Sequence, residues 1–383
     1  MIQSRTHNCN ELRLSDAGKN VTIVGWYENI RKVSKNLGFL ILRDFYGTTQ
    51  VVIETEEMMQ VIDSVNKEST ISVTGVVRER SSKNKDLATG EIEVVPEKIE
   101  ILGKCIYNAL PFEINQSKDA DENTRLKYRY LDLRNPAVKG NIVLRSKIVA
   151  ELRQKMNSLN FMEITTPILT CSSPEGARDY LVPARNHPGK FYALPQAPQQ
   201  FKQILMASGF DRYFQIAPCF RDEDARADRS PGEFYQLDFE MSFATQEDVF
   251  RVGEEVLTAT FEKFAPKGFQ VTQAPYPVIS YKQAMLEFGS DKPDLRNPLR
   301  IIDLSEFFDR CTFKPFQNKT VRAIKIHGHQ SKGFHEKMLK FATGIGMGGL
   351  GYLEVQEDLS YKGPIDKFIP DDMKAELREK AGL

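Results

Sequence analysis

Two neighbouring segments carry polar residues whose types and spacing suit a ligand of mixed charge. The pattern predicts a strand from Tyr213 to Glu223 and a second from Tyr235 to Phe243, each alternating apolar and polar residues. Successive side chains of a strand point to opposite faces. Solvated strands also alternate, but the paired pattern and the charged loop between the segments favour a binding face. Its polar residues are Arg221, Glu223, Gln236, Asp238 and Glu240.

These strings resemble a known family. A Phe-Arg-x-Glu strand, a loop and a strand with Gln-x-Asp-x-Glu-x-x-Phe resemble motif 2 of class II aminoacyl-tRNA synthetases, and the wording of residues 220–229 is similar to the bacterial aspartyl-tRNA synthetases. Similar strings occur at 129–134, 174–183 and 289–296. The resemblance implies that aspartate reacts with ATP, with Mg²⁺ present, to give aspartyl-adenylate. Aspartate then passes to its tRNA.

The resemblance implies a role for Arg221 at the reacting centre. The carboxylate of aspartate attacks the α-phosphate of ATP, so two anions meet. A fixed guanidinium can neutralise both through charge-assisted, bidentate hydrogen bonds. Arg221 matches the family residue in that catalytic position, and Asp222 and Glu223 match the ATP-binding positions beside it.

The family also implies how aspartate is held. Glu175, Gln199 and Asp238 match positions around its ammonium and backbone, and Lys202 matches a lysine that meets its side-chain carboxylate. Structural alternatives exist, since Glu175 could cap a loop and Lys202 could be a solvated helix residue. The aspartate-binding set implied by the resemblance is Glu175, Gln199, Gln200, Phe201, Lys202, Arg221, Gln236 and Asp238.

The N-terminal third predicts an OB barrel, the fold that binds single strands on its second and third strands. A helix from Glu56 to Asn66 precedes the fourth predicted strand. In the family, Phe39 matches an aromatic that stacks on an anticodon base, although a core position is the alternative. The tRNA-binding set implied by the resemblance is Arg31, Phe39, Gln50, Glu93, Arg226 and Arg229. The predicted strands are Val21–Tyr27, Phe39–Arg43, Thr49–Ile53, Thr70–Val77 and Ile92–Leu102.

The chain as a whole is predicted to be an α+β multidomain protein. Asn135-Pro136 and Gly140 suggest breaks, so the second region is interpreted as a linker. The predicted regions are an OB anticodon-binding domain at 1–104, a linker or hinge at 105–140, an incomplete class II antiparallel-sheet catalytic core with motifs 1 and 2 at 141–298, and a partial α/β insertion domain at 299–383.

Residues 142–168 resemble motif 1 of the class. Apolar residues recur at helical spacing from Ile142 to Leu159, and a predicted strand, Phe161 to Ile168, follows. In the family, this helix and strand form the interface of a homodimer, with a proline at its centre, here Pro167. Core packing is the alternative for the helix taken alone.

The family's motif 3, with its acid–arginine pair, is not found in this sequence, so the Mg²⁺–ATP site is expected to be incomplete. The chain is therefore expected to be a fragment that does not form aspartyl-adenylate alone. Gly344, Gly346 and Gly349 satisfy G-x-G-x-x-G, but a helix is predicted before them and a strand after, the reverse of a dinucleotide site. Two alternatives stay open: a ligase that charges both tRNA(Asp) and tRNA(Asn), and an inactive tRNA-binding fragment.

The amino-acid composition excludes several other classes of protein. Lys plus Arg and Asp plus Glu are both 52, which argues against coating nucleic acid by bulk charge. No apolar run approaches the length of a membrane span and no signal core is present, so a cytoplasmic protein without a membrane partner is expected. The five cysteines are scattered and form no C-x-x-C. His327, His329 and His335 lack a zinc pattern, so no metal ligands are assigned.

Overall fold

The computed structural model describes residues 4–173, 175–223 and 232–382. It divides into two compact units, Met1–Val249 with Ala259–Phe264, and Phe250–Thr258 with Ala265–Leu383. The boundary lies within helix α6 (Gln246–Phe264). The domain limits expected from the sequence stay predictions. In the described residues, no helix combines the length and the apolar character that crossing a membrane requires.

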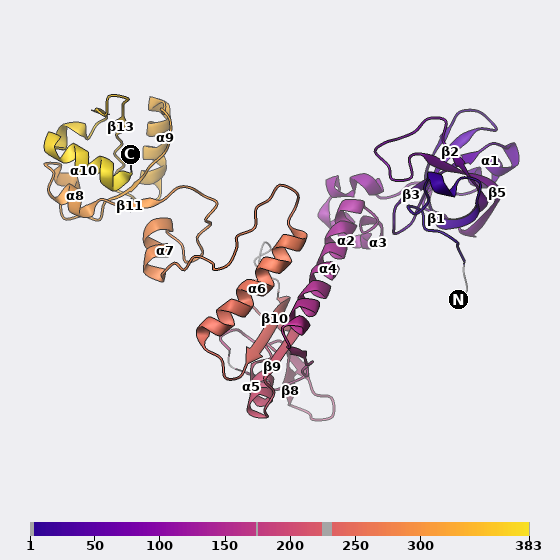
Figure 1. Ribbon diagram of the computed structural model, residues 1–383, viewed down its shortest axis with the longest axis horizontal. Helices are drawn as coiled ribbons and strands as arrows, with labels where there is room; N and C mark the ends of the chain where they lie inside the picture. The colour runs from indigo at the N-terminus through magenta and orange to yellow at the C-terminus, as the bar shows by residue number, and fades with distance from the viewer. Residues whose placement is uncertain (1–3, 174, 224–231, 383) are drawn as a thin grey trace. The chain divides into compact units, whose positions relative to one another are not determined.

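The first unit begins with a closed five-stranded barrel of order β1-β2-β3-β5-β4, drawn in indigo in Figure 1. All neighbouring strands are antiparallel except β3 and β5, whose parallel pairing closes the barrel. The predicted OB barrel and the helix before its fourth strand are confirmed. The elements are η1 (Leu14–Asp16), β1 (Asn20–Lys32), β2 (Gly38–Arg43), β3 (Thr48–Ile53), α1 (Glu56–Asp63), β4 (Thr70–Glu79) and β5 (Ile92–Gly103).

The barrel has its own hydrophobic core, because alternate residues of each strand point inward. Ile23, Leu40, Ile71 and Val94 are fully buried in it, and Ile62 from α1 packs against them. Phe39 is not one of these core residues, and only part of its side chain is covered. The alternative that placed Phe39 in the core is therefore wrong.

The segment predicted as a linker is helical, which is a correction. It contains η2 (Ile114–Asp119), α2 (Glu122–Lys127) and α3 (Arg129–Asp132), and helix α4 (Pro136–Ser158) already starts within it. Asn135 is the N-cap of α4, accepting from the backbone of Ala137 at 2.9 Å. Pro136 occupies the first turn, where its missing N–H costs nothing. The pair that suggested a break therefore begins a helix, and Gly140 lies inside it.

Helix α4 buries little of its own surface. Over its 23 residues, only Val138 and Met156 are buried, whereas Ile142 and Leu144 are exposed. The strand predicted to follow, Phe161 to Ile168, is much shorter than expected. Only β6 (Met162–Glu163) forms, because its pairing with β9 extends over two residues.

A small sheet of order β10-β9-β6 forms the rest of the first unit's framework. Strands β9 (Arg212–Phe220) and β10 (Glu233–Met241) pair in antiparallel register over nine residues, from Glu233 opposite Phe220 to Met241 opposite Arg212. A separate hairpin, β7 (Leu181–Pro183) with β8 (Phe191–Ala193), precedes helix α5 (Gln199–Ala207).

The second unit has an aromatic core. Phe308 packs edge to face against both Phe307 and Phe316, with ring centroids 5.2 and 5.0 Å apart. This unit mixes short strands and helices, as predicted for residues 299–383. Its elements are α7 (Tyr281–Phe288), β11 (Ile301–Asp303), α8 (Ser305–Asp309), η3 (Lys314–Phe316), β12 (Arg322–Ile324), α9 (Lys332–Gly344), β13 (Glu354–Val355), β14 (Tyr361–Lys362), η4 (Asp366–Phe368) and α10 (Asp371–Ala381).

The glycine cluster has the surroundings expected from the sequence. Helix α9 ends at Gly344, Gly346 has a φ of +91°, and β13 follows. A dinucleotide fingerprint needs a strand before the glycines and a helix after them. The order is reversed here, so the glycines form a turn from helix to strand.

A buried charge cluster links the barrel to the helices that follow it. Arg43 donates to both carboxylate oxygens of Glu68 at 2.7 Å, and both side chains are about 5% exposed. Arg134, just before α4, also donates to Glu68, and its guanidinium lies 4.2 Å from the ring of Trp26. Glu68 therefore neutralises two arginines that come from different parts of the chain.

We predict that Glu68→Gln destabilises the barrel by about 3 kcal/mol, the low end of the cost of losing a buried ionic partner, because Glu28 Oε1, 3.6 Å from Arg43 Nη1, remains as a counter-charge. The measurement is urea unfolding followed by fluorescence of Trp26, the only tryptophan in the chain. The control is Asp63→Asn, which breaks the exposed Lys32–Asp63 pair and should cost less than about 1 kcal/mol. Equal losses in the two variants would contradict the assigned role of Glu68.

Candidate active site

One face of the β9–β10 pair carries the polar residues singled out in the sequence. Opposite residues in an antiparallel pair point to the same face. Asp238 lies opposite Gln215 and Glu240 opposite Tyr213, so Gln236, Asp238 and Glu240 share this face with Gln215 and Tyr213. The predicted alternation of the second strand is thereby confirmed. The first strand ends at Phe220, so Arg221 and Glu223 lie beyond it rather than within it, which corrects the predicted end at Glu223.

Lys202 reaches this face from helix α5. Its Nζ lies 2.8 Å from Asp238 Oδ1 and 2.8 Å from Glu240 Oε1, and the residue is 9% exposed. Burial lowers the pKa of Lys202, but hydrogen bonds and charge from the two carboxylates outweigh it and leave the pKa above its usual value. Lys202 therefore remains a cation at neutral pH. The alternative that placed it on a solvated face is wrong.

Asp238 retains unused hydrogen-bonding capacity. Its Oδ2 is buried and has no hydrogen-bond partner within the described part of the chain. A buried acceptor without a donor costs free energy, so such atoms call for an explanation. A ligand with an N–H group would supply the missing donor.

Arg221 follows directly after β9 and is half-buried. Its backbone N–H donates to Gly232 O at 2.8 Å, and its guanidinium lies 5.0 Å from the centre of the Phe234 ring. The Tyr180 side chain packs against the backbone here, since a Cβ on Gly232 would lie 2.4 Å from its hydroxyl oxygen. Arg221 is therefore held at the end of the polar face.

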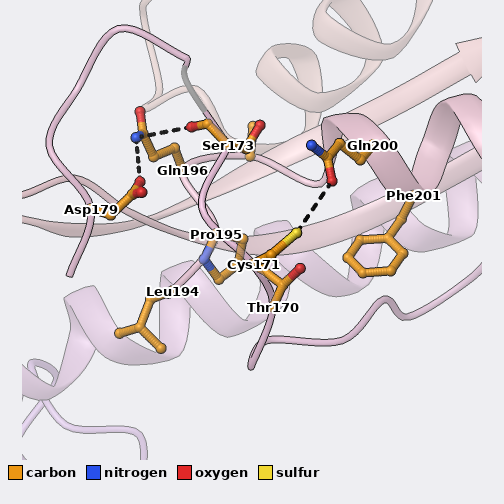
Figure 2. Close-up of a pocket in the computed structure, with 10 residues that line it drawn as sticks. Thr170, Cys171, Ser173, Asp179, Leu194, Pro195, Gln196, Gln200 and Phe201 are labelled. Atoms are coloured by element: carbon orange, nitrogen blue, oxygen red, sulfur yellow. Dashed lines mark hydrogen bonds between the residues drawn. The ribbon is translucent and has the colours of Figure 1, made fainter. Parts of the chain in front are cut away.

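A small pocket lies between the start of α5 and the preceding loops (Figure 2). Gln200 and Phe201 line it, as does Cys171, whose Sγ donates to Gln200 Oε1 at 3.8 Å. Gln196 and Asp179 complete the side away from α5, and their side chains meet at 2.6 Å. The pocket thus includes two residues of the predicted aspartate-binding set.

The other predicted residues are less closely connected. Glu175 is exposed, and its carboxylate accepts only from Ser173 Oγ, at 3.2 Å, among the described residues. Gln199 and Glu223 make no side-chain hydrogen bond in the described ranges, while Gln236 accepts from Cys219 Sγ at 3.3 Å. The structure therefore joins Lys202 to Asp238 directly but brings neither Gln199 nor Glu223 into a contact.

The predicted RNA-reading residues gather on one outer face of the barrel. Arg31 lies opposite Phe39 across β1 and β2, with its guanidinium 4.9 Å from the ring centre. Gln50 Nε2 donates to Glu93 Oε2 at 2.9 Å, and Arg78 binds the other oxygen of Glu93. This face lies on the strands that OB folds use for single-stranded nucleic acid.

The roles of the site residues remain predictions. Arg226 and Arg229, predicted to touch the tRNA, lie outside the described residues. Within those residues, no group of three or more His, Cys, Asp or Glu side chains could hold a metal ion. They do not supply the Mg²⁺ site that the resemblance implies, and no step is derived through that ion.

Two residues that make hydrogen bonds around the candidate site, Gln196 and Arg178, were not predicted from the sequence. Gln196 is 2% exposed and makes several hydrogen bonds in the pocket wall. Arg178 donates from Nε to the backbone oxygen of Asp222 at 2.8 Å, and Asp222 donates back from its N–H to Arg178 O. A glutamine between two prolines was the available signal for Gln196, whereas nothing in the spacing pointed to Arg178.

Comparison with known proteins identifies two family models in the chain. Residues 121–355 match the model for tRNA synthetases class II (D, K and N). Residues 21–102 match the model for an OB-fold nucleic acid binding domain, and β1–β5 form that barrel. The two models together cover both the barrel and the β9–β10 face.

Curated relatives extend the match to the whole chain. The aspartate–tRNA(Asp/Asn) ligase of Rickettsia bellii (strain OSU 85-389) is 51% identical over 395 residues, and the aspartate–tRNA ligase of Streptomyces avermitilis is 50% identical over 388. Each alignment covers 100% of this chain but 65% of the relative, so the chain spans about two thirds of the length of these relatives.

A solved structure shows the same fold. The asparaginyl-tRNA synthetase of Pyrococcus horikoshii, complexed with asparaginyl-adenylate, superposes with a TM-score of 0.63. The superposition covers 76% of this chain and 70% of that one, at 24% identity. At this identity, the likeness concerns the fold alone.

We predict that iodoacetamide at pH 8 modifies Cys171 much faster than Cys219. Burial raises the pKa of Cys219 to about 11, so roughly one thiol in a thousand is the reactive thiolate at that pH. Cys171 is exposed in the pocket. Peptide mass spectrometry over time gives both rates, and Cys171→Ser is the control that identifies the fast site. Comparable rates would contradict the burial of Cys219 against β10.

Proposed function

We propose that this chain, which belongs to the class II tRNA synthetases (D, K and N), carries the anticodon-binding and part of the activating region of an aspartate–tRNA ligase. The observation that carries this proposal is the Lys202–Asp238–Glu240 cluster, on the same polar face at whose end Arg221 lies. It presents a cation and a free buried acceptor at one place. Aspartate needs both, because it has an ammonium group and two carboxylates.

The cluster suits aspartate in two ways. An ammonium group has three N–H donors, and Lys202 uses two of them on Asp238 and Glu240. The third can meet the side-chain carboxylate of aspartate. The unpartnered Oδ2 of Asp238 can accept from the ammonium of aspartate, which would satisfy the buried oxygen. Glu175 would supply a further negative charge near that ammonium.

Arg221 would serve the reacting centre. The α-carboxylate oxygen of aspartate forms a bond to the α-phosphorus of ATP, and pyrophosphate leaves with the electrons of the broken bond. Negative charge accumulates on the α-phosphate during this step. A fixed guanidinium at that position stabilises the charge by electrostatics, without a nucleophilic side chain. Asp222 and Glu223 would lie near the rest of ATP.

The outer face of the barrel would bind the anticodon. Phe39 offers a partly exposed ring for stacking on an unpaired base, an interaction worth about 1–3 kcal/mol per base. Gln50 would meet a base edge with its second amide N–H and its amide oxygen, while the buried Glu93, bonded to Gln50 and Arg78, would hold Gln50 in place. The proposed tRNA partner is tRNA(Asp). The name of the Rickettsia relative includes both tRNA(Asp) and tRNA(Asn), so tRNA(Asn) is a candidate second substrate. Charging assays of the complete protein with each tRNA separate the two functions.

We further propose that residues outside these 383 complete the site. The chain spans 65% of the length of its curated relatives, and the described residues provide no metal-binding cluster. The 383 residues alone would then bind tRNA weakly without forming aspartyl-adenylate. The complete protein is expected to act in the cytoplasm, which cell fractionation can test.

A homodimer through helix α4 is part of the proposal. The helix buries two residues of its 23 and leaves Ile142 and Leu144 exposed, so a large part of its apolar surface lacks a partner in one chain. Ile168 and Leu169, next to Pro167, are also exposed apolar residues. A second copy of the chain would cover these residues.

The function is tested by ATP–pyrophosphate exchange that depends on aspartate. We predict exchange by the complete protein and a drop of about 10²–10³-fold in kcat/KM for Arg221→Ala, since one charge-stabilising donor is lost. The control is Arg322→Ala, which removes an exposed strand arginine in the second unit and should leave the rate unchanged.

Two results would contradict the proposal. Wild-type complete protein without aspartate-dependent exchange would rule out an aspartate ligase. Robust exchange by the 383 residues alone would show that they already contain a complete site, and would contradict the proposal that other residues complete it.

The dimer is tested by sedimentation equilibrium of the complete protein. We predict that Leu144→Glu shifts the protein from dimer to monomer, because a buried carboxylate at the interface lacks a partner. Val33→Glu, at an exposed apolar residue of the barrel, should leave the dimer intact. A wild-type monomer at micromolar concentration would argue against this interface.

A further inference from the structure

Gln196 is a buried polar side chain that holds a loop rather than facing the pocket alone. Its Oε1 accepts from the backbone N–H of Ala177 at 3.1 Å. Its Nε2 donates to Asp179 Oδ1 at 2.6 Å, to Ala177 O at 2.9 Å and to Ser173 O at 3.4 Å. Figure 2 shows the carboxamide directed at Asp179 and Ser173. One side chain thus binds several points of the segment around Glu175.

These partners fix which end of the amide is oxygen. A backbone N–H can only donate, and the two backbone carbonyls and the Asp179 carboxylate can only accept. The oxygen of Gln196 must therefore face Ala177 and its nitrogen must face the other three groups. A carboxylate at position 196 would face three acceptors without a proton to share, so glutamate is a poor replacement despite its equal size.

The loop from Glu175 to Asp179, here called the Glu175 loop, is otherwise fixed mainly by the two hydrogen bonds between Arg178 and the backbone of Asp222. Glu175 and Arg178 are exposed, and Gly176 has a φ of +98° with open space around it. Segments with few buried apolar contacts take their order from specific hydrogen bonds. At its far end, Asp179 also accepts from Ser172 Oγ. The Gln196 contacts are thus central to the position of the loop.

We propose that Gln196 is a positioning residue that holds the Glu175 loop so that the Glu175 carboxylate is available to the ammonium of aspartate. The inference rests on the proposed function. Gln196 lies on the pocket side with Gln200 and Phe201, whereas Arg178 connects the loop to Asp222 on the side proposed for ATP. Loss of the Gln196 contacts therefore weakens the binding of aspartate more than that of ATP.

The first experiment measures amide hydrogen exchange in the 383-residue chain without any substrate. We expect exchange of the Ala177 N–H to become about 5- to 30-fold faster in Gln196→Met, because this N–H loses its acceptor, Gln196 Oε1. A lost hydrogen bond of about 1–2 kcal/mol corresponds to that change in rate. The matched control is Gln203→Met on an exposed position of α5, which should leave the exchange unchanged. Unchanged exchange at Ala177 in Gln196→Met would overturn the holding role.

The second experiment uses the complete protein and aspartate-dependent ATP–pyrophosphate exchange. We expect KM for aspartate to rise at least about tenfold in Gln196→Met, with kcat and KM for ATP within about twofold of wild type. Gln196→Glu should be worse. Adding Asp179→Asn to it should recover part of the loss, because the introduced amide at position 179 can then donate to the introduced carboxylate at position 196. A purely structural defect would lower kcat and raise both KM values alike, and that result would overturn the proposal.

The two experiments separate the inference from the function on which it rests. If wild-type protein shows no aspartate-dependent exchange, the proposed function fails, while the substrate-free measurement still decides whether Gln196 holds the loop. If the loop loosens in Gln196→Met but KM for aspartate does not change, the loop does not serve aspartate and the inference is wrong.

Discussion

The antiparallel register of β9 and β10 is the constraint on which the rest of the site depends. A shift of one residue would turn Gln236, Asp238 and Glu240 to the opposite face. Lys202 would then lose both carboxylates, and a buried ammonium without a counter-charge is unfavourable. Helix α5 is thereby tied to the sheet through a charge cluster as well as through packing. The position of Arg221, one residue past β9, follows from the same register.

Buried charge also organises the barrel end of the first unit. Glu68 lies between Arg43 of β2 and Arg134 of the helical segment before α4, and the Arg134 guanidinium stacks near Trp26. Such clusters contribute less to stability than their Coulomb energies suggest, because the charges lose their hydration. Such clusters favour one arrangement of the chain, however, because each buried charge is stable only next to its oppositely charged partners. The cluster can therefore determine how the chain leaves the barrel.

Helices and strands with a strong periodic pattern could be predicted from the sequence. Features that depend on individual contacts between distant residues could not. The five barrel strands and helix α1 were predicted from local sequence patterns, which a single stretch of the chain contains. The prediction from Asn135-Pro136 was wrong because such a pair can follow the end of a helix or begin a new one. Here Asn135 is the N-cap and Pro136 is the first residue of α4. Gln196 could not be found by spacing, since its partners, Ser173, Ala177 and Asp179, approach it only after the chain folds. The family resemblance supplied the rest of the candidate site, which periodicity alone would have left as a generic charged face.

Gly232 leaves room for the Tyr180 side chain at the end of the polar face. A Cβ there would lie 2.4 Å from the hydroxyl oxygen of Tyr180, and the Gly232 carbonyl holds the N–H of Arg221. The hydroxyl is the outer end of an exposed, rotatable side chain, so a larger residue at position 232 would move the Tyr180 ring, whereas the backbone oxygen of Arg221, at 3.4 Å, is in ordinary contact. A substitution at Gly232 would therefore act on the site indirectly, through Tyr180. Redesign of the site toward another amino acid would have to choose the residues at positions 180 and 232 together.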